Sequence, residues 1–132
     1  MQLNKSVTYA IAALAQLAAD ESGQPFPNSV ICQRTGMPER FLLQILRHLA
    51  NAGLVTSLRG VNGGYMLAGP ADRISIWDVC EAIDPTGPSD LKLDGMTSGS
   101  QRTVTAALDG VAADMRKRLA AVTIADLKLP KA

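Results

Sequence analysis

The chain has few of the residues that build catalytic and metal sites. Its 132 residues include one histidine and two cysteines, Cys32 and Cys80, which lie 48 positions apart with no second metal ligand beside either one. The sequence shows no Ser/His/Asp set, no paired carboxylates and no metal-ligand spacing. These absences argue against an enzyme. They also favour two free thiols that fill space as small hydrophobic side chains.

Long hydrophobic runs are absent as well. No apolar run approaches the roughly 20 residues that a membrane-spanning helix requires. The first residues lack a basic flank followed by an apolar stretch and a small-residue cleavage site. We therefore expect a soluble, cytoplasmic protein with no membrane partner. Hydrophobic residues make up 47% of the chain and charged residues 19%, which is typical of a globular protein, and a length of 132 residues predicts one domain with a short appendage.

Charge of either sign is nearly balanced, and the formal net charge of +1 neither favours nor excludes a nucleic-acid partner. The distribution of charge is more informative. Between residues 28 and 65 four arginines face a single acid, Glu39, for a local balance of +3. The four are Arg34, Arg40, Arg47 and Arg59. Such an excess favours contact with phosphate.

The first quarter of the chain has the periodicity of two helices. Apolar residues spaced by three and four in an alanine-rich stretch predict a largely buried helix from Lys5 to Asp20. Glycine and proline in residues 21–27 end this helix. Asn28 or Ser29 is expected to cap a short second helix that ends at Gly36.

A third helix is predicted from Pro38, which suits a first helical turn, to about Ala52. Gly53 is expected to end it with a positive φ. One face of this helix is predicted to be apolar and consists of Phe41, Leu42, Ile45, Leu46 and Leu49. The other face holds Arg40, Gln44, Arg47 and His48. Those polar side chains are available to a partner.

A strand and a glycine-rich hairpin follow the third helix. Residues 54–58 alternate like a half-buried strand, and the run from Arg59 to Leu67 predicts a hairpin. Helix, turn, helix, strand and wing is the order of a winged DNA-binding domain. Arg59 could be an ordinary solvated arginine, but narrow minor grooves attract arginine, which favours a groove contact. Gly63 and Gly64 alone would indicate only a turn with positive φ.

The remainder of the chain predicts two helices joined by a loop. Ser75 is expected to cap a helix whose inward face is Ile76, Val79, Cys80 and Ile83. A loop rich in Pro, Gly and Ser follows. A long helix is predicted from Gln101 to Val122, with an apolar stripe of Val104, Leu108, Val111, Met115, Leu119 and Val122.

This stripe needs a second surface to cover it. A second copy of the same helix is the economical cover and would give a two-fold homodimer. The alternative is that the long helix folds back on the first helix of its own chain. The predicted fold is mainly α with a small β-hairpin. It comprises a winged helix-turn-helix domain over residues 1–84, a flexible loop over 85–100, and a dimerisation helix with a C-terminal tail over 101–132.

These features resemble the Rrf2 family of bacterial transcriptional regulators, which includes IscR, NsrR and CymR. The resemblance covers roughly residues 1–84, and the last third matches only in kind, as a dimerisation helix. It is carried by Tyr9-Ala10 with the alanine-rich helix, Gly36 to Leu46, Ala52 to Val55, Arg59-Gly60 with Gly63 to Leu67, Ile74 to Val79, and Glu81 to Ile83.

The resemblance implies a dimeric winged helix-turn-helix that binds double-stranded DNA at a pseudo-palindromic operator, usually as a repressor. The start of the third helix would enter the major groove, where arginine and glutamine match guanine and adenine edges. Arg59 would reach the minor groove. The candidate DNA-binding residues are Lys5, Tyr9, Pro38, Glu39, Arg40, Phe41, Gln44, Arg47, Arg59, Gly60, Gly63 and Gly64.

Two departures from the family pattern limit what carries over. Cluster-bearing members hold their iron with three closely spaced cysteines before the long helix, and the matching stretch from Asp84 to Arg102 has none. We therefore expect no iron–sulfur cluster and no other cofactor. A carboxylate that reads bases in those members is replaced by Leu43, so the operator sequence does not carry over.

The signal to which such a regulator responds stays open. A small molecule, a partner protein, thiol oxidation and constitutive binding are all compatible with the sequence. The alternative functions are a thiol- or ligand-responsive regulator and a winged module used only for protein contact. The polar third helix favours DNA over a protein partner, because it lacks a broad exposed apolar patch.

Overall fold

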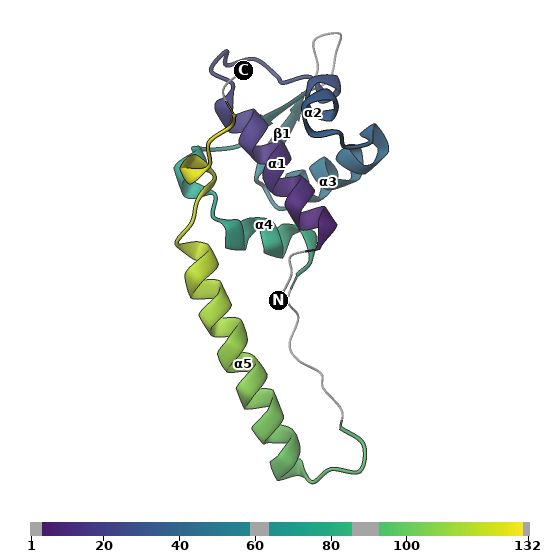
Figure 1. The fold of residues 1–132 in the computed structure, drawn as a ribbon, viewed down its shortest axis with the longest axis vertical. Helices are drawn as coiled ribbons and strands as arrows, with labels where there is room; N and C mark the ends of the chain where they lie inside the picture. Colours follow the sequence, from purple (N-terminus) through teal and green to yellow (C-terminus); the bar gives the residue numbers. More distant parts are fainter. Residues whose placement is uncertain (1–3, 59–63, 86–92, 131–132) are drawn as a thin grey trace.

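The computed structural model describes residues 4–58, 64–85 and 93–130. Figure 1 shows α5 extending away from the other helices, which pack together around α1. This arrangement confirms the predicted fold class, mainly α with one hairpin and a long C-terminal helix. The elements in chain order are α1 (Lys5–Ala19), α2 (Asn28–Thr35), α3 (Glu39–Asn51), β1 (Val55–Leu58), β2 (Gly64–Leu67), η1 (Ala71–Arg73), α4 (Ile76–Ile83), α5 (Ser98–Ala120) and η2 (Ile124–Asp126).

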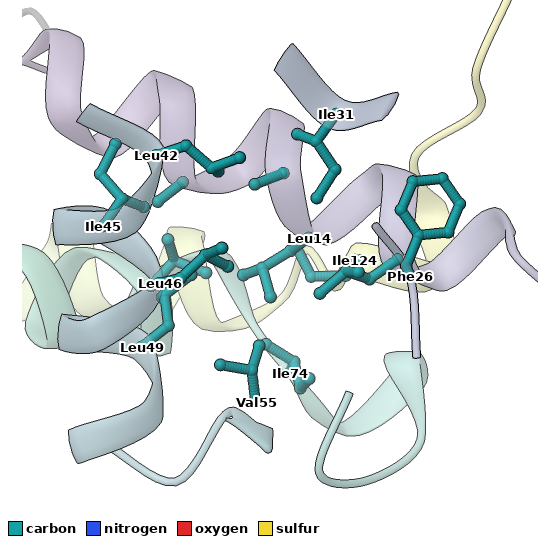
Figure 2. Close-up of a cluster of buried hydrophobic side chains, with 14 of the residues drawn as sticks. Leu14, Phe26, Ile31, Leu42, Ile45, Leu46, Leu49, Val55, Ile74 and Ile124 are labelled. Atoms are coloured by element: carbon teal, nitrogen blue, oxygen red, sulfur yellow. The ribbon is translucent and has the colours of Figure 1, made fainter. Parts of the chain in front are cut away.

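Helix α1 is central because its buried face combines leucine with alanine. Ala10, Ala13 and Leu14 are fully buried. Small side chains allow α2, α3 and α4 to approach α1 closely, as the dense packing of protein interiors requires. Figure 2 shows Leu14 surrounded by side chains from α2, α3, the hairpin and the C-terminal segment. The core therefore joins elements from both ends of the chain.

The two helices of the helix-turn-helix begin one residue after a proline. Pro27 and Pro38 occupy the N-cap positions of α2 and α3, with φ near −65° and extended ψ. The predicted cap at Asn28 or Ser29 and the placement of Pro38 inside the first turn are therefore wrong by about one residue. Gly36 ends α2, as predicted, and it does so in the left-handed region with φ of 72°.

The hairpin pairs β1 with β2 in antiparallel register, with Val55 opposite Leu67. Of the four β1 residues only Val55 is buried, so the predicted alternation of a half-buried strand is not present. The wing residues Arg59, Gly60 and Gly63 lie outside the described residues. Near the start of β2 the amide N–H groups of Phe26 and Tyr65 each donate to the other's carbonyl oxygen, at 2.9 and 3.3 Å.

This pairing explains the glycine at the start of β2. Gly64 does not have a positive φ, contrary to the simple turn interpretation of Gly63-Gly64. A Cβ atom at Gly64 would instead collide with the carbonyl oxygen of Phe26. The residue must be glycine because the linker before α2 passes directly against the hairpin.

We expect Gly64→Ala to lower the free energy of unfolding by about 1–3 kcal/mol, because the new methyl group meets backbone that cannot rotate away. Urea denaturation measures the effect. Gly69→Ala is the matched control, because Gly69 has open space around it and no positive φ, and it should stay within about 0.5 kcal/mol of the wild type. Equal stability of the two variants would contradict the steric explanation.

Helix α4 begins as the sequence predicts. The Ser75 hydroxyl accepts from the Asp78 N–H at 3.0 Å, and the Asp78 carboxylate accepts from the Ser75 N–H at 2.9 Å. These reciprocal bonds form a capping box. On the inward face Ile76 and Val79 are buried, whereas Cys80 and Ile83 are half-buried.

Helix α5 is longer and more exposed than the other helices. It begins at Ser98, three residues before the predicted start at Gln101, because the Thr97 side chain accepts from the Ser100 N–H at 3.1 Å and caps it. No residue of α5 is buried, and Leu108 and Val111 are 46% and 58% exposed. The helix does not fold back along α1. No helix in the described part of the chain is long and apolar enough to cross a membrane.

The chain after α5 returns to the helical domain, which the sequence analysis did not anticipate. The Ile76 N–H donates to the Val122 carbonyl and the Ile124 N–H donates to the Ile74 carbonyl, both at 2.9 Å. Ile124 is only 1% exposed and belongs to the same core cluster as Leu14. Residues near the C-terminus therefore complete the core of the winged portion.

Candidate nucleic-acid interface

Helix α3 divides into a buried face and an exposed face. Leu42, Ile45, Leu46 and Leu49 are buried, as predicted. Phe41 was assigned to the same face, and this assignment is wrong because its side chain is 47% exposed. It lies at the edge of the buried arc, where the start of α1 covers only part of the ring. The other exposed residues of α3 include Arg40, Leu43, Gln44, Arg47 and His48.

The starts of α1 and α3 meet at a cluster of Lys5, Tyr9 and Phe41. The rings of Tyr9 and Phe41 are edge to face, with centroids 6.3 Å apart and an interplanar angle of 68°. The Lys5 ammonium lies 5.4 Å from the centroid of the Tyr9 ring, a cation–π contact. Three of the predicted site residues are thus brought together beside the first turn of α3.

Two arginines on α3 are available to a partner. In the part of the chain that the structure describes, no hydrogen bond or ion pair engages the side chain of Arg40 or Arg47. Gln44 lies one turn after Arg40 and is also exposed. Exposed donors at this spacing on one helix face are suited to base edges and phosphates.

Arg34 differs from these arginines. Its Nη1 donates to Oε1 of Gln16 at 3.1 Å, and its guanidinium lies 5.7 Å from the centroid of the Phe26 ring. Gln16 is a buried polar residue of α1, so this bond satisfies an acceptor that would otherwise lose its water. Arg34 therefore ties α2 to α1, and the charge count between residues 28 and 65 overstated what is free to meet phosphate.

The remaining candidates that the structure describes are of two kinds. Pro38 and Glu39 are exposed at the start of α3, where Glu39 complements the positive end of the helix. Gly64 is required by the fold itself. Leu43 was not among the candidates, yet it is an exposed apolar side chain at the edge of the face that holds Arg40 and Arg47. The family resemblance could have added it to the candidates, because it places Leu43 where other members carry a base-reading carboxylate.

The thiols do not fit an iron–sulfur cluster. Cys32 lies on α2 and Cys80 on α4, both half-buried against the core. Burial raises the pKa of both thiols. The charge of Glu39 raises the pKa of Cys32 further, and the charge of Glu81 does the same for Cys80. Cluster ligation requires several thiolates at one place. Among the described residues no group of three His, Cys, Asp or Glu side chains is placed to hold a metal ion.

The raised pKa values predict slow thiol chemistry. At pH 7–8 the protonated thiol is favoured in the folded protein, so we expect Cys32 and Cys80 to react with iodoacetamide more slowly than in the urea-unfolded chain. The rate in the folded protein should continue to rise at a pH where the unfolded chain has reached its plateau. Mass spectrometry of timed samples measures both rates. A folded-state rate above the unfolded rate would contradict the prediction.

A helix-turn-helix whose second helix exposes arginine and glutamine, followed by a two-stranded hairpin, defines a winged helix-turn-helix DNA-binding protein. The family model Rrf2, described as an iron-dependent transcriptional regulator, matches residues 3–129. The chain belongs to the Rrf2 family of transcriptional regulators and is not an enzyme. The match also extends through α5, beyond the region on which the sequence resemblance relied.

Similar proteins agree with this assignment. An HTH-type transcriptional regulator of Mycobacterium tuberculosis H37Rv is 36% identical over 132 residues, covering 96% of this chain and 81% of that protein. The structure of CymR, the global cysteine regulator of Bacillus subtilis, matches with a TM-score of 0.73 and 25% identity, covering 96% and 95% of the two chains. The structure of T. potens IscR matches with a TM-score of 0.72 and 28% identity, covering 96% and 85%.

Proposed function

We propose that this protein represses transcription by binding a pseudo-palindromic operator as a homodimer, without an iron–sulfur cluster. The observation that carries the proposal is the exposed face of α3, where Arg40, Gln44 and Arg47 point away from the core. Side chains that the fold does not use are free to bond to DNA. Because the family consists of transcriptional regulators, we expect the partner of this face to be DNA.

The contacts divide by chemistry. Arg40 and Gln44 read base edges in the major groove, because their paired donors match guanine and adenine. Arg47 and Lys5 contact phosphate, with Lys5 held beside the Tyr9 ring. Pro38, Glu39 and Phe41 border this contact, and Arg59, with Gly60 and Gly63, forms the minor-groove contact from the wing.

Dimerisation accounts for the exposed stripe of α5. Leu108 and Val111 are largely exposed, and only the end of the helix, at Leu119, packs against the core of its own chain. Full burial of a large aliphatic side chain is worth about 1.5–3 kcal/mol. A second α5 related by a two-fold axis would bury the stripe and place two α3 helices for a palindromic site.

The lack of cysteine ligands supports the part of the proposal that excludes an iron–sulfur cluster. The stretch from Asp84 to Arg102 has no cysteine, and Asp90 and Asp94 replace thiolates poorly as iron ligands. After anaerobic reconstitution with iron and sulfide, we expect a colourless protein with no visible absorption band. Stoichiometric bound iron and sulfide would contradict this part of the proposal.

Selection of bound duplexes from a random DNA pool tests the function as a whole. We expect an inverted repeat to be enriched, and mobility shifts should show tighter binding to it than to a scrambled duplex of equal composition. Adding salt should weaken binding to both duplexes, because phosphate contacts release counterions. If no motif is enriched and binding to DNA is absent, a role in protein contact replaces the proposal.

A further inference from the structure

The connection between α5 and the winged portion is short and well ordered by its contacts. We call residues 121–127 the return segment, because they bring the chain from the end of α5 back to the domain. Helix α5 ends at Ala120, and Ile124, four residues later, is already in the core. The interval is too short to act as a flexible linker.

Backbone bonds hold the return segment on both sides of Thr123. Val122 accepts from Ile76, Ile124 donates to Ile74, and Thr123 forms an antiparallel bridge with Ser75. The Asp126 carboxylate then accepts from the Thr123 N–H at 2.9 Å and closes the turn. The segment is therefore bonded to the residues that start α4.

The same core holds the DNA-reading helix. Ile124 shares a cluster with Leu14 of α1 and with Leu46 of α3. Figure 2 shows Ile124 beside Leu14, with the α3 leucines on the other side of the cluster. Cores are packed too tightly to deform continuously, so the direction of α5 is fixed relative to α3.

We propose that the return segment is a positioning element that sets the spacing between the two DNA half-sites that the dimer accepts. The inference rests on the proposed function. With 23 residues α5 is about 35 Å long, at a rise of about 1.5 Å per residue. A tilt of about 10° at the junction would move the far end of such a rod by about 6 Å, close to two base-pair steps of about 3.4 Å. A firm junction therefore gives strict spacing, and a loosened junction gives relaxed spacing.

The test compares Ile124→Ala with Ile31→Ala. Both changes shorten a buried isoleucine of the same core, but Ile31 lies on α2 and has no part in the junction. Affinity is measured for the selected operator and for versions with the half-sites moved by one or two base pairs. Binding to a duplex with a single half-site measures DNA recognition by one protomer. Sedimentation measures dimerisation, and urea denaturation measures stability.

The wild type should lose about tenfold or more in affinity when the spacing changes by two base pairs, because each half-site then turns away from its helix. Ile31→Ala should keep this discrimination. Ile124→Ala should reduce it to about threefold or less, while affinity for the single half-site stays near that of the wild type. A merely structural role for Ile124 would lower stability and leave the discrimination unchanged.

A surface variant keeps the test decisive if Ile124→Ala does not fold. Asp126→Ala removes an exposed carboxylate that closes the return turn, and it should reduce spacing discrimination in the same direction. Folded variants of the return segment that retain full discrimination would overturn the proposal. So would a wild type that binds its motif specifically but accepts all spacings. Absence of any sequence-specific binding would instead defeat the proposed function.

Discussion

Changing Leu108 and Met115 together to aspartate is expected to yield monomers that no longer bind the operator. Both side chains lie in the apolar stripe of α5, and Leu108 is 46% exposed in the single chain. Two carboxylates in each helix would place four like charges in one small interface, and burying unpaired charge costs several kcal/mol per group. Sedimentation at micromolar concentration measures the oligomeric state, and mobility shift measures DNA binding.

Ala106→Asp with Ala113→Asp is the matched control for this experiment. Both alanines are exposed on α5 and lie about half a turn away from the stripe. The control introduces the same charges at a similar cost in helix propensity but should remain dimeric and bind DNA. A monomeric wild type, or a dimeric Leu108/Met115 variant, would show that α5 has a different role.

Arg40→Ala is expected to weaken operator binding by about 5- to 150-fold, which corresponds to roughly 1–3 kcal/mol for one specific base contact. Discrimination at one base position should relax, and binding to random DNA should change less. The expectation follows from the exposure of Arg40 and from its lack of a bonding partner among the described residues. Fluorescence anisotropy with single-base operator variants provides the measurement.

Two other arginines sharpen the interpretation. Arg47→Ala should weaken specific and random binding alike and reduce the slope of log affinity against log salt by about one, as for a phosphate contact. Arg34→Ala should leave affinity unchanged and lower stability, because the buried Gln16 would lose its donor. If Arg34→Ala weakens binding as much as Arg40→Ala while the protein remains folded, the division of roles is wrong.

Features fixed by neighbouring residues were predictable from the sequence. The capping box at Ser75 depends on residues three apart, and the left-handed ends at Gly36 and Gly53 depend on the glycine itself. The buried leucines of α3 follow from helical periodicity. Local chemistry decides each of these features, so the linear sequence contains the information.

Features that depend on distant segments were not predictable. Phe41 fits the apolar period of α3, but the packing of α1 decides which edge of that helix is covered. Ile124 follows a long helix and a short turn, and no nearby residue indicates that this segment forms hydrogen bonds with Ile74 and Ile76. A charge count could not distinguish Arg34 from the other arginines, because its hydrogen-bond partner Gln16 is distant in sequence.

The tie between Phe26 and Tyr65 has a consequence for how such a regulator could change its target. A hairpin of two short strands is marginally stable alone in water. Here the bridge between Phe26 and Tyr65 also holds the start of β2 against the helical domain, and the close approach of Phe26 requires glycine at position 64. Because these contacts are made by Phe26, Gly64 and Tyr65, substitutions at positions 59–63 are expected to leave them intact, so the target of the regulator can change while the domain keeps its stability.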